Sequence, residues 1–98
     1  MASYATSSPF TDLDGTCEIN AGNCSSYTSS TLGAGIVINL PGGCFEVEFP
    51  GPNRAYKICA TPSGSGFVGT AMEKGDDSDG EEAWTATAIA QPAVSGRS

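Results

Sequence analysis

Hydrophobic and polar residues alternate most regularly between residues 44 and 60. Pairing Phe49 with Arg54 across residues 50–53 sets Glu46 opposite Lys57 and Cys44 opposite Cys59. One face of this hairpin then carries the charges and both cysteines, and the other collects apolar side chains: Phe45, Val47, Phe49, Tyr56 and Ile58. The pattern predicts a half-buried β-hairpin over 44–49 and 54–60, closed by a disulfide between Cys44 and Cys59.

The β-branched segment 36–40 predicts a strand before this hairpin. A two-residue turn around Pro41-Gly42 would set Ile36 and Ile38 on the core face, beside Val47 and Phe45. A shift of one residue would move both isoleucines to the face of the glutamates, so the two-residue turn is favoured. Three strands in a central meander follow from this.

The rest of the chain gives weaker strand signals and no helical period. Residues 67–73 and 84–90 predict two more strands, while 13 glycines and six prolines punctuate the chain. We therefore expect one all-β domain over residues 1–98, a small disulfide-stapled antiparallel sandwich or barrel. The polar segment 1–16 and residues 91–98 are expected to be flexible ends.

The cysteines indicate an oxidising compartment. Four cysteines without histidine, and without the close spacing of zinc knuckles, favour disulfides over a metal site. If Cys44 pairs with Cys59, then Cys17 is left with Cys24 across a short loop, although two other connectivities remain open. No basic segment followed by an apolar stretch opens the chain, so we expect a mature secreted or cell-surface protein.

Charge and hydropathy exclude some partners. A formal net charge of -7 argues against nucleic acid, whose binding depends on Lys and Arg. No apolar run approaches the length of a membrane span, so membrane insertion is not expected. The sequence leaves the oligomeric state open.

Catalytic chemistry finds little support. Without histidine, the Ser-His and Cys-His nucleophile arrangements are excluded. Glu46 and Glu48 share a strand face, as a pair of glycosidase carboxylates could. The favoured interpretation is an exposed face that the two carboxylates keep soluble, with Glu46 paired to Lys57 across the strands. We expect no enzyme and no cofactor.

The acidic run over residues 75–82 offers a weak calcium candidate. Asp77, Asp79 and Glu81 alternate, and their oxygens suit a hard cation. The full pattern of an EF-hand loop is not present. A solvated loop is the favoured interpretation, and no metal site is predicted.

The tip of the hairpin is the candidate binding site, through Pro50, Asn53, Arg54 and Tyr56. A tip fixed by a disulfide could present Arg54 to a protease, as an inhibitory loop does. Alternatively, Tyr27, Tyr56 and Trp84, together with the Ser and Thr stretches, could form a shallow sugar-binding face, although core packing is the default for Trp84 and Tyr56. The resulting expectation is a secreted binding module for an extracellular protein or carbohydrate. An inhibitor of a secreted hydrolase that presents loop 50–56, and a structural subunit of a surface or fibre assembly, are the alternatives.

Overall fold

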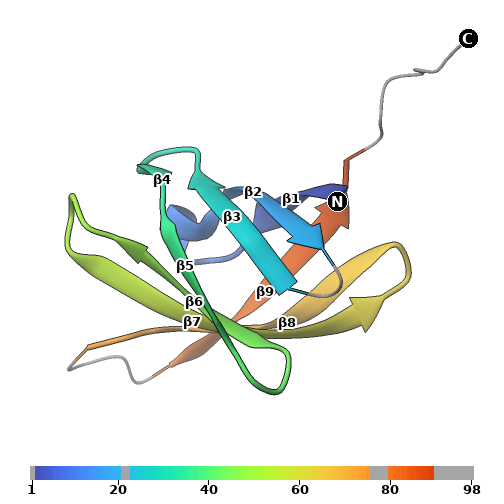
Figure 1. Cartoon of the computed structure of the whole chain (residues 1–98). Coiled ribbons are helices and arrows are strands. Elements are labelled where there is room, and N and C mark those ends of the chain that lie inside the picture. The colour runs from blue at the N-terminus through green and yellow to red at the C-terminus, as the bar shows by residue number, and fades with distance from the viewer. Residues whose placement is uncertain (1, 21–22, 76–79, 90–98) are drawn as a thin grey trace, which may run out of the picture.

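The computed structural model describes residues 2–20, 23–75 and 80–89. They form a single antiparallel sheet of nine strands that curls into a nearly closed barrel, with one 3-10 turn, η1 (Thr11–Leu13) (Figure 1). The strands are β1 (Ala2–Ser7), β2 (Gly15–Asn20), β3 (Asn23–Ser29), β4 (Gly33–Ala34), β5 (Ile36–Leu40), β6 (Cys44–Phe49), β7 (Arg54–Ser63), β8 (Gly66–Glu73) and β9 (Glu81–Ala88). Their order in the sheet is β4-β3-β2-β1-β9-β8-β7-β6-β5. The expected all-β fold is confirmed, and its barrel alternative is the one adopted.

The predicted hairpin is confirmed residue by residue. Strands β6 and β7 pair Cys44 with Cys59, Glu46 with Lys57 and Phe49 with Arg54. The disulfide between Cys44 and Cys59 is present. Side chains on β6 alternate between buried and half-buried, as a strand with one face on the core must. Strand β7 extends three residues beyond the predicted end and continues into β8.

The register predicted between 36–40 and 44–49 is wrong by one residue. Ile36 lies opposite Glu48 and Ile38 opposite Glu46, so both isoleucines face outward, 52% and 42% exposed. The cause is the turn, which has three residues instead of two. Gly42 and Gly43 both adopt positive φ, at 80° and 78°, a conformation that glycine accepts readily. The outer face of β5 is therefore apolar and exposed.

The start of the chain is not a flexible end, contrary to expectation. Strand β1 lies inside the sheet, between β2 and β9, and Leu13 of η1 is fully buried. The Thr6 hydroxyl donates to the Leu13 carbonyl at 2.7 Å, which fastens η1 to β1. The other expected flexible end, residues 91–98, lies outside the described residues.

The core fills the barrel with side chains from all of the longer strands. Its largest fully buried members are Trp84, Tyr27, Phe49, Leu13, Ile58 and Val47. Since Trp84, Tyr27 and Tyr56 are all buried, the aromatic sugar-binding face considered from the sequence does not form. No helix among the described elements has the length and apolar character that crossing a bilayer requires.

The barrel closes where the chain passes from one end of the sheet order to the other. Strand β4 pairs with β3, and after Gly35 the chain enters β5, which pairs with β6 (Figure 1). A side chain at position 35 would come within 2.6 Å of a Val47 methyl, so glycine is needed at this crossing. Two hydrogen bonds join β3 to the crossing and β5 in the described chain: Gly35 N–H to the Tyr27 carbonyl, 2.8 Å, and the Asn39 side-chain amide to the Cys24 carbonyl, 2.7 Å. We call this junction the seam.

Candidate functional site

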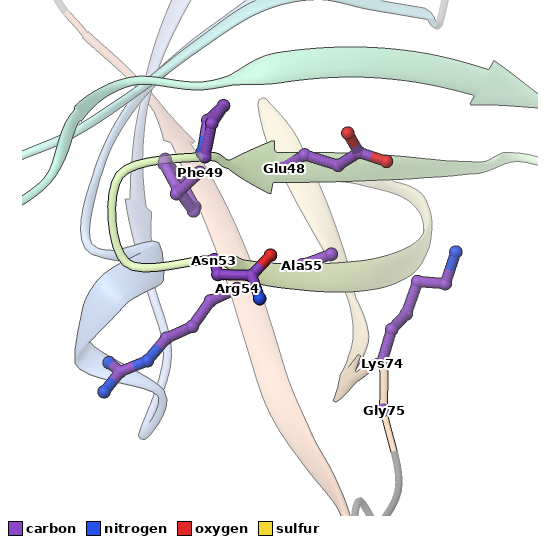
Figure 2. A pocket seen from close by; sticks show the side chains of 8 residues that line it. Glu48, Phe49, Asn53, Arg54, Ala55, Lys74 and Gly75 are labelled. Atoms are coloured by element: carbon purple, nitrogen blue, oxygen red, sulfur yellow. The ribbon is translucent and has the colours of Figure 1, made fainter.

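The tip of the β6–β7 hairpin borders a surface depression of about 380 Å³. Figure 2 shows how side chains from β6, β7 and the end of β8 surround it. Its lining residues are Glu48, Phe49, Pro50, Asn53, Arg54, Ala55, Lys74 and Gly75. We call it the tip depression.

Local backbone geometry fixes the tip. Residues 50–53 connect Phe49 to Arg54, and the Asn53 N–H donates to the Pro50 carbonyl at 3.1 Å. Asn53 adopts a positive φ of 60°, which asparagine tolerates better than most residues. At the other end of the hairpin the Cys44–Cys59 disulfide ties the two strands together. The hairpin is thus fixed by the turn at its tip and by the disulfide at its other end.

Asp12 of η1 holds the first residues of β7. Its Oδ2 lies 2.7 Å from Arg54 Nη1 and accepts a hydrogen bond from the Tyr56 hydroxyl at 2.8 Å. In Figure 2 the Arg54 side chain extends away from Lys74, toward the pale-blue turn of η1. The Arg54 side chain is half-exposed, and its guanidinium is paired with Asp12. Arg54 therefore lines the depression and does not extend freely into solvent.

Electrostatics strengthen the contacts of Asp12 with Arg54 and Tyr56, which we call the Asp12 clamp. Burial acts to raise the pKa of Asp12, but the hydrogen bonds from Arg54 and Tyr56, together with the Arg54 charge, outweigh burial and lower the pKa below its usual 3.8. Burial, then the hydrogen bond to the Asp12 carboxylate, raises the pKa of Tyr56. Asp12 is consequently ionised and Tyr56 neutral at neutral pH.

Lys74 brings a cation to the opposite side of the tip depression. It follows the end of β8, where its N–H donates to the Ala55 carbonyl at 2.8 Å. Its Nζ lies 2.9 Å from Glu46 Oε2, an ion pair that links the end of β8 to β6. The register predicted for Glu46 is right, but its ion-pair partner is Lys74 and not Lys57.

The structure brings together three of the four predicted binding residues. Pro50, Asn53 and Arg54 line the tip depression. Tyr56 is only 3% exposed, and its hydroxyl binds the same Asp12 carboxylate oxygen that pairs with Arg54. Sequence reasoning missed Asp12 and Lys74. The Gly64-Ser65 pair could have indicated Lys74, because a two-residue turn there sets Lys74 opposite Ala55.

The remaining predicted site residues are not part of the tip depression. Asp77 and Asp79 lie outside the described residues, and Glu81 is the first residue of β9. Within residues 2–20, 23–75 and 80–89, no three side chains of the metal-binding types gather at one point. Cys17 and Cys24 are free, buried thiols, so the expected second disulfide is absent from this structure.

The tip depression offers charged and polar groups to a ligand. Glu48 supplies a carboxylate, Lys74 an ammonium group and Asn53 an amide. No protein-family model, curated protein or solved structure matches this chain.

Proposed function

We propose that this chain is a non-enzymatic binding module for an extracellular protein, and that the tip depression receives a polar or charged side chain of the partner. The observation that carries the proposal is that the β6–β7 hairpin is fixed in place before a ligand binds. The disulfide and the Asp12 clamp fix the hairpin at both ends, so little conformational entropy remains to be lost on binding. The disulfide also supports a secreted or cell-surface location.

A protein partner is favoured over a carbohydrate by the placement of the aromatic rings. Sugar sites commonly use exposed rings as stacking platforms, but Tyr27, Tyr56 and Trp84 are at most 3% exposed. Strands β5 and β8 instead expose the apolar side chains of Ile36 and Met72 beside charged groups. Exposed apolar side chains with a polar rim are typical of protein-binding surfaces. Carbohydrate is the second candidate ligand, supported by the polar lining of the depression.

Inhibition of a secreted hydrolase through loop 50–56 is the alternative that Arg54 supports. Presentation of Arg54 to a protease would require its ion pair with Asp12 to open. An Asp12→Ala variant should then inhibit better than the original chain, and Arg54→Ala should not inhibit at all. Assays of both variants against a panel of secreted trypsin-like proteases test this directly.

The binding proposal is tested with a displayed library of random linear peptides, selected on the full chain, and with an oligosaccharide array. Asn53→Gly removes the amide while keeping a residue that accepts positive φ, and Lys74→Met removes the charge while keeping most of the side chain. Selected peptides should bind each variant about tenfold more weakly. The matched control is Val68→Ser, an exposed position on β8 outside the depression, which should leave binding unchanged.

Two results would count against this proposal. Peptides that bind the Asn53 and Lys74 variants as well as the original chain would place the binding surface elsewhere. Ligands found only on the oligosaccharide array, and lost in the same variants, would make carbohydrate the ligand of the tip depression.

A further inference from the structure

The outer face of β5 to β8 carries an ordered row of four side chains. Strand pairing aligns Ile38 with Glu46, Glu46 with Lys57, and Lys57 with Met72. Their sequence neighbours on β6 and β7 are core residues, so the row projects outward. Ile38 and Met72, the two ends of the row, are 42% and 37% exposed.

This row is complementary to itself. It reads apolar, acidic, basic, apolar, so that reversing it exchanges the two charges and leaves the apolar ends in place. A two-fold axis parallel to the strands, between β6 and β7, would set Glu46 against Lys57 of the partner subunit. The same axis would set Ile38 against Met72 of the partner subunit, and each contact would occur twice.

The neighbouring rows tolerate the same arrangement. On one side, the next row consists of Leu40, the disulfide-bonded Cys44 and Cys59, and Thr70. No residue of this row carries a charge. On the other side, the 52% exposed Ile36 would meet the aliphatic part of Lys74 of the partner subunit.

The charge distribution supports a second copy as the occupant of this face. The chain carries a formal net charge of -7 with only four basic residues, yet two of the four, Lys57 and Lys74, lie here beside Glu46 and Glu48. The face is therefore locally neutral. The charge on the rest of each copy repels the other copy, but salt at physiological strength screens charges beyond about 8 Å.

From these observations we infer that the outer face of β5 to β8 is a self-complementary interface between two copies of this chain. The inference does not rest on the proposed function. The proposed interface and the proposed binding site nevertheless share residues, because Glu48, Ala55 and Lys74 border both the tip depression and this face. In the dimer the two depressions lie at the same end, so pairing narrows access to both.

The test is sedimentation velocity of the full chain over a wide concentration range, without added ligand. The original chain should show a concentration-dependent dimer. Glu46→Lys and Lys57→Glu each place like charges across the axis, and each should weaken dimerisation by about tenfold or more. Mixing the two variants should restore a heterodimer, because every charged contact across that axis is again between opposite signs.

Controls separate the interface from a general effect of charge or folding. Glu82→Lys changes the net charge as Glu46→Lys does, at an exposed β9 position opposite the buried Ala71, and should leave the dimer intact. If Glu46→Lys fails to fold, Ile38→Ser with Met72→Ser tests the apolar ends instead. A chain that stays monomeric at all concentrations overturns the inference, as does a dimer that the single charge reversals leave unchanged.

Discussion

The indole of Trp84 donates a hydrogen bond to the Tyr27 hydroxyl at 2.9 Å, joining β9 to β3 through the barrel interior. The same hydroxyl donates to the Leu13 carbonyl at 2.6 Å. One buried oxygen thus satisfies an indole N–H and a main-chain carbonyl from two other parts of the chain. Tyr27 and Trp84 are each 1% exposed, so water cannot easily replace these bonds.

Tyr27→Phe should therefore be costly although the two rings have nearly the same shape. The substitution leaves the Trp84 N–H without its partner in the core and removes a donor from the Leu13 carbonyl. We expect a loss of about 1–3 kcal/mol in the free energy of unfolding, measured by urea denaturation. Tyr4→Phe is the control, since the half-buried Tyr4 contributes mainly a ring contact with Phe67, and it should change stability by less than about 0.5 kcal/mol. Equal effects of the two substitutions would contradict the role given to the Tyr27 hydroxyl.

Replacing both Cys44 and Cys59 with serine should lower the free energy of unfolding by about 3 kcal/mol. The bridge closes a loop with a sequence separation of 15, and its loss enlarges the conformational freedom of the unfolded chain. Chemical denaturation of the double variant measures the change. A loss below about 1 kcal/mol would mean that strand pairing holds the hairpin without the bridge.

The pair Cys17 and Cys24 should behave as inert thiols in the folded protein. The hydrogen bond between them raises the pKa of Cys17 and lowers the pKa of Cys24, so it is burial that protects both: they are 1% and 2% exposed. Because a thiol reagent cannot reach either sulfur in the folded chain, it should label neither residue in the native protein and both after denaturation. If denaturation releases no thiol, the second disulfide expected from the sequence is present after all, and non-reducing peptide mapping would locate it.

The Asp12 clamp should make stability depend on acid. Because the folded pKa of Asp12 lies below its usual value, the contribution of the clamp is complete above that value and is lost as pH falls through the folded pKa. Asp12→Asn should thus cost about 1 kcal/mol at neutral pH, a modest figure because Arg54 is half-exposed. Urea midpoints for the two proteins should converge in strong acid, and a gap that persists there would show that the cost does not come from the charge.

The sequence was most informative where two independent patterns agreed. On the 44–60 hairpin, the alternation of apolar residues and the placement of Cys44 opposite Cys59 required the same register, and that register is observed. On segment 36–40, apolar side chains alone decided the prediction. The rule that they face the core failed because two glycines at positive φ lengthened the turn by one residue.

The first strands escaped prediction for a different reason. Strands β1 and β3 are rich in Ser, Thr and Ala, and much of what they bury is small or polar, including Thr6 and Ser29. A hydrophobic pattern is faint in such segments, although the neighbouring strands hold them in place. The tip depression was recovered only in part. Asp12 holds Arg54 through a contact between residues 42 positions apart, which no local pattern encodes, whereas the two-residue turn at Gly64-Ser65 could have placed Lys74 opposite Ala55.

The seam gives the barrel a place to open without undoing a strand ladder. Elsewhere around the described sheet, separating two neighbouring long strands breaks a continuous series of main-chain hydrogen bonds, but parting β3 from β5 breaks one main-chain bond and one made by the Asn39 side chain. Motions that widen the barrel should concentrate there, and main-chain amides of β5 that face β3 should exchange with deuterium sooner than those of β7. The molecule is in this sense one sheet rolled onto itself, in which only two hydrogen bonds among the described residues hold β3 against the crossing and β5.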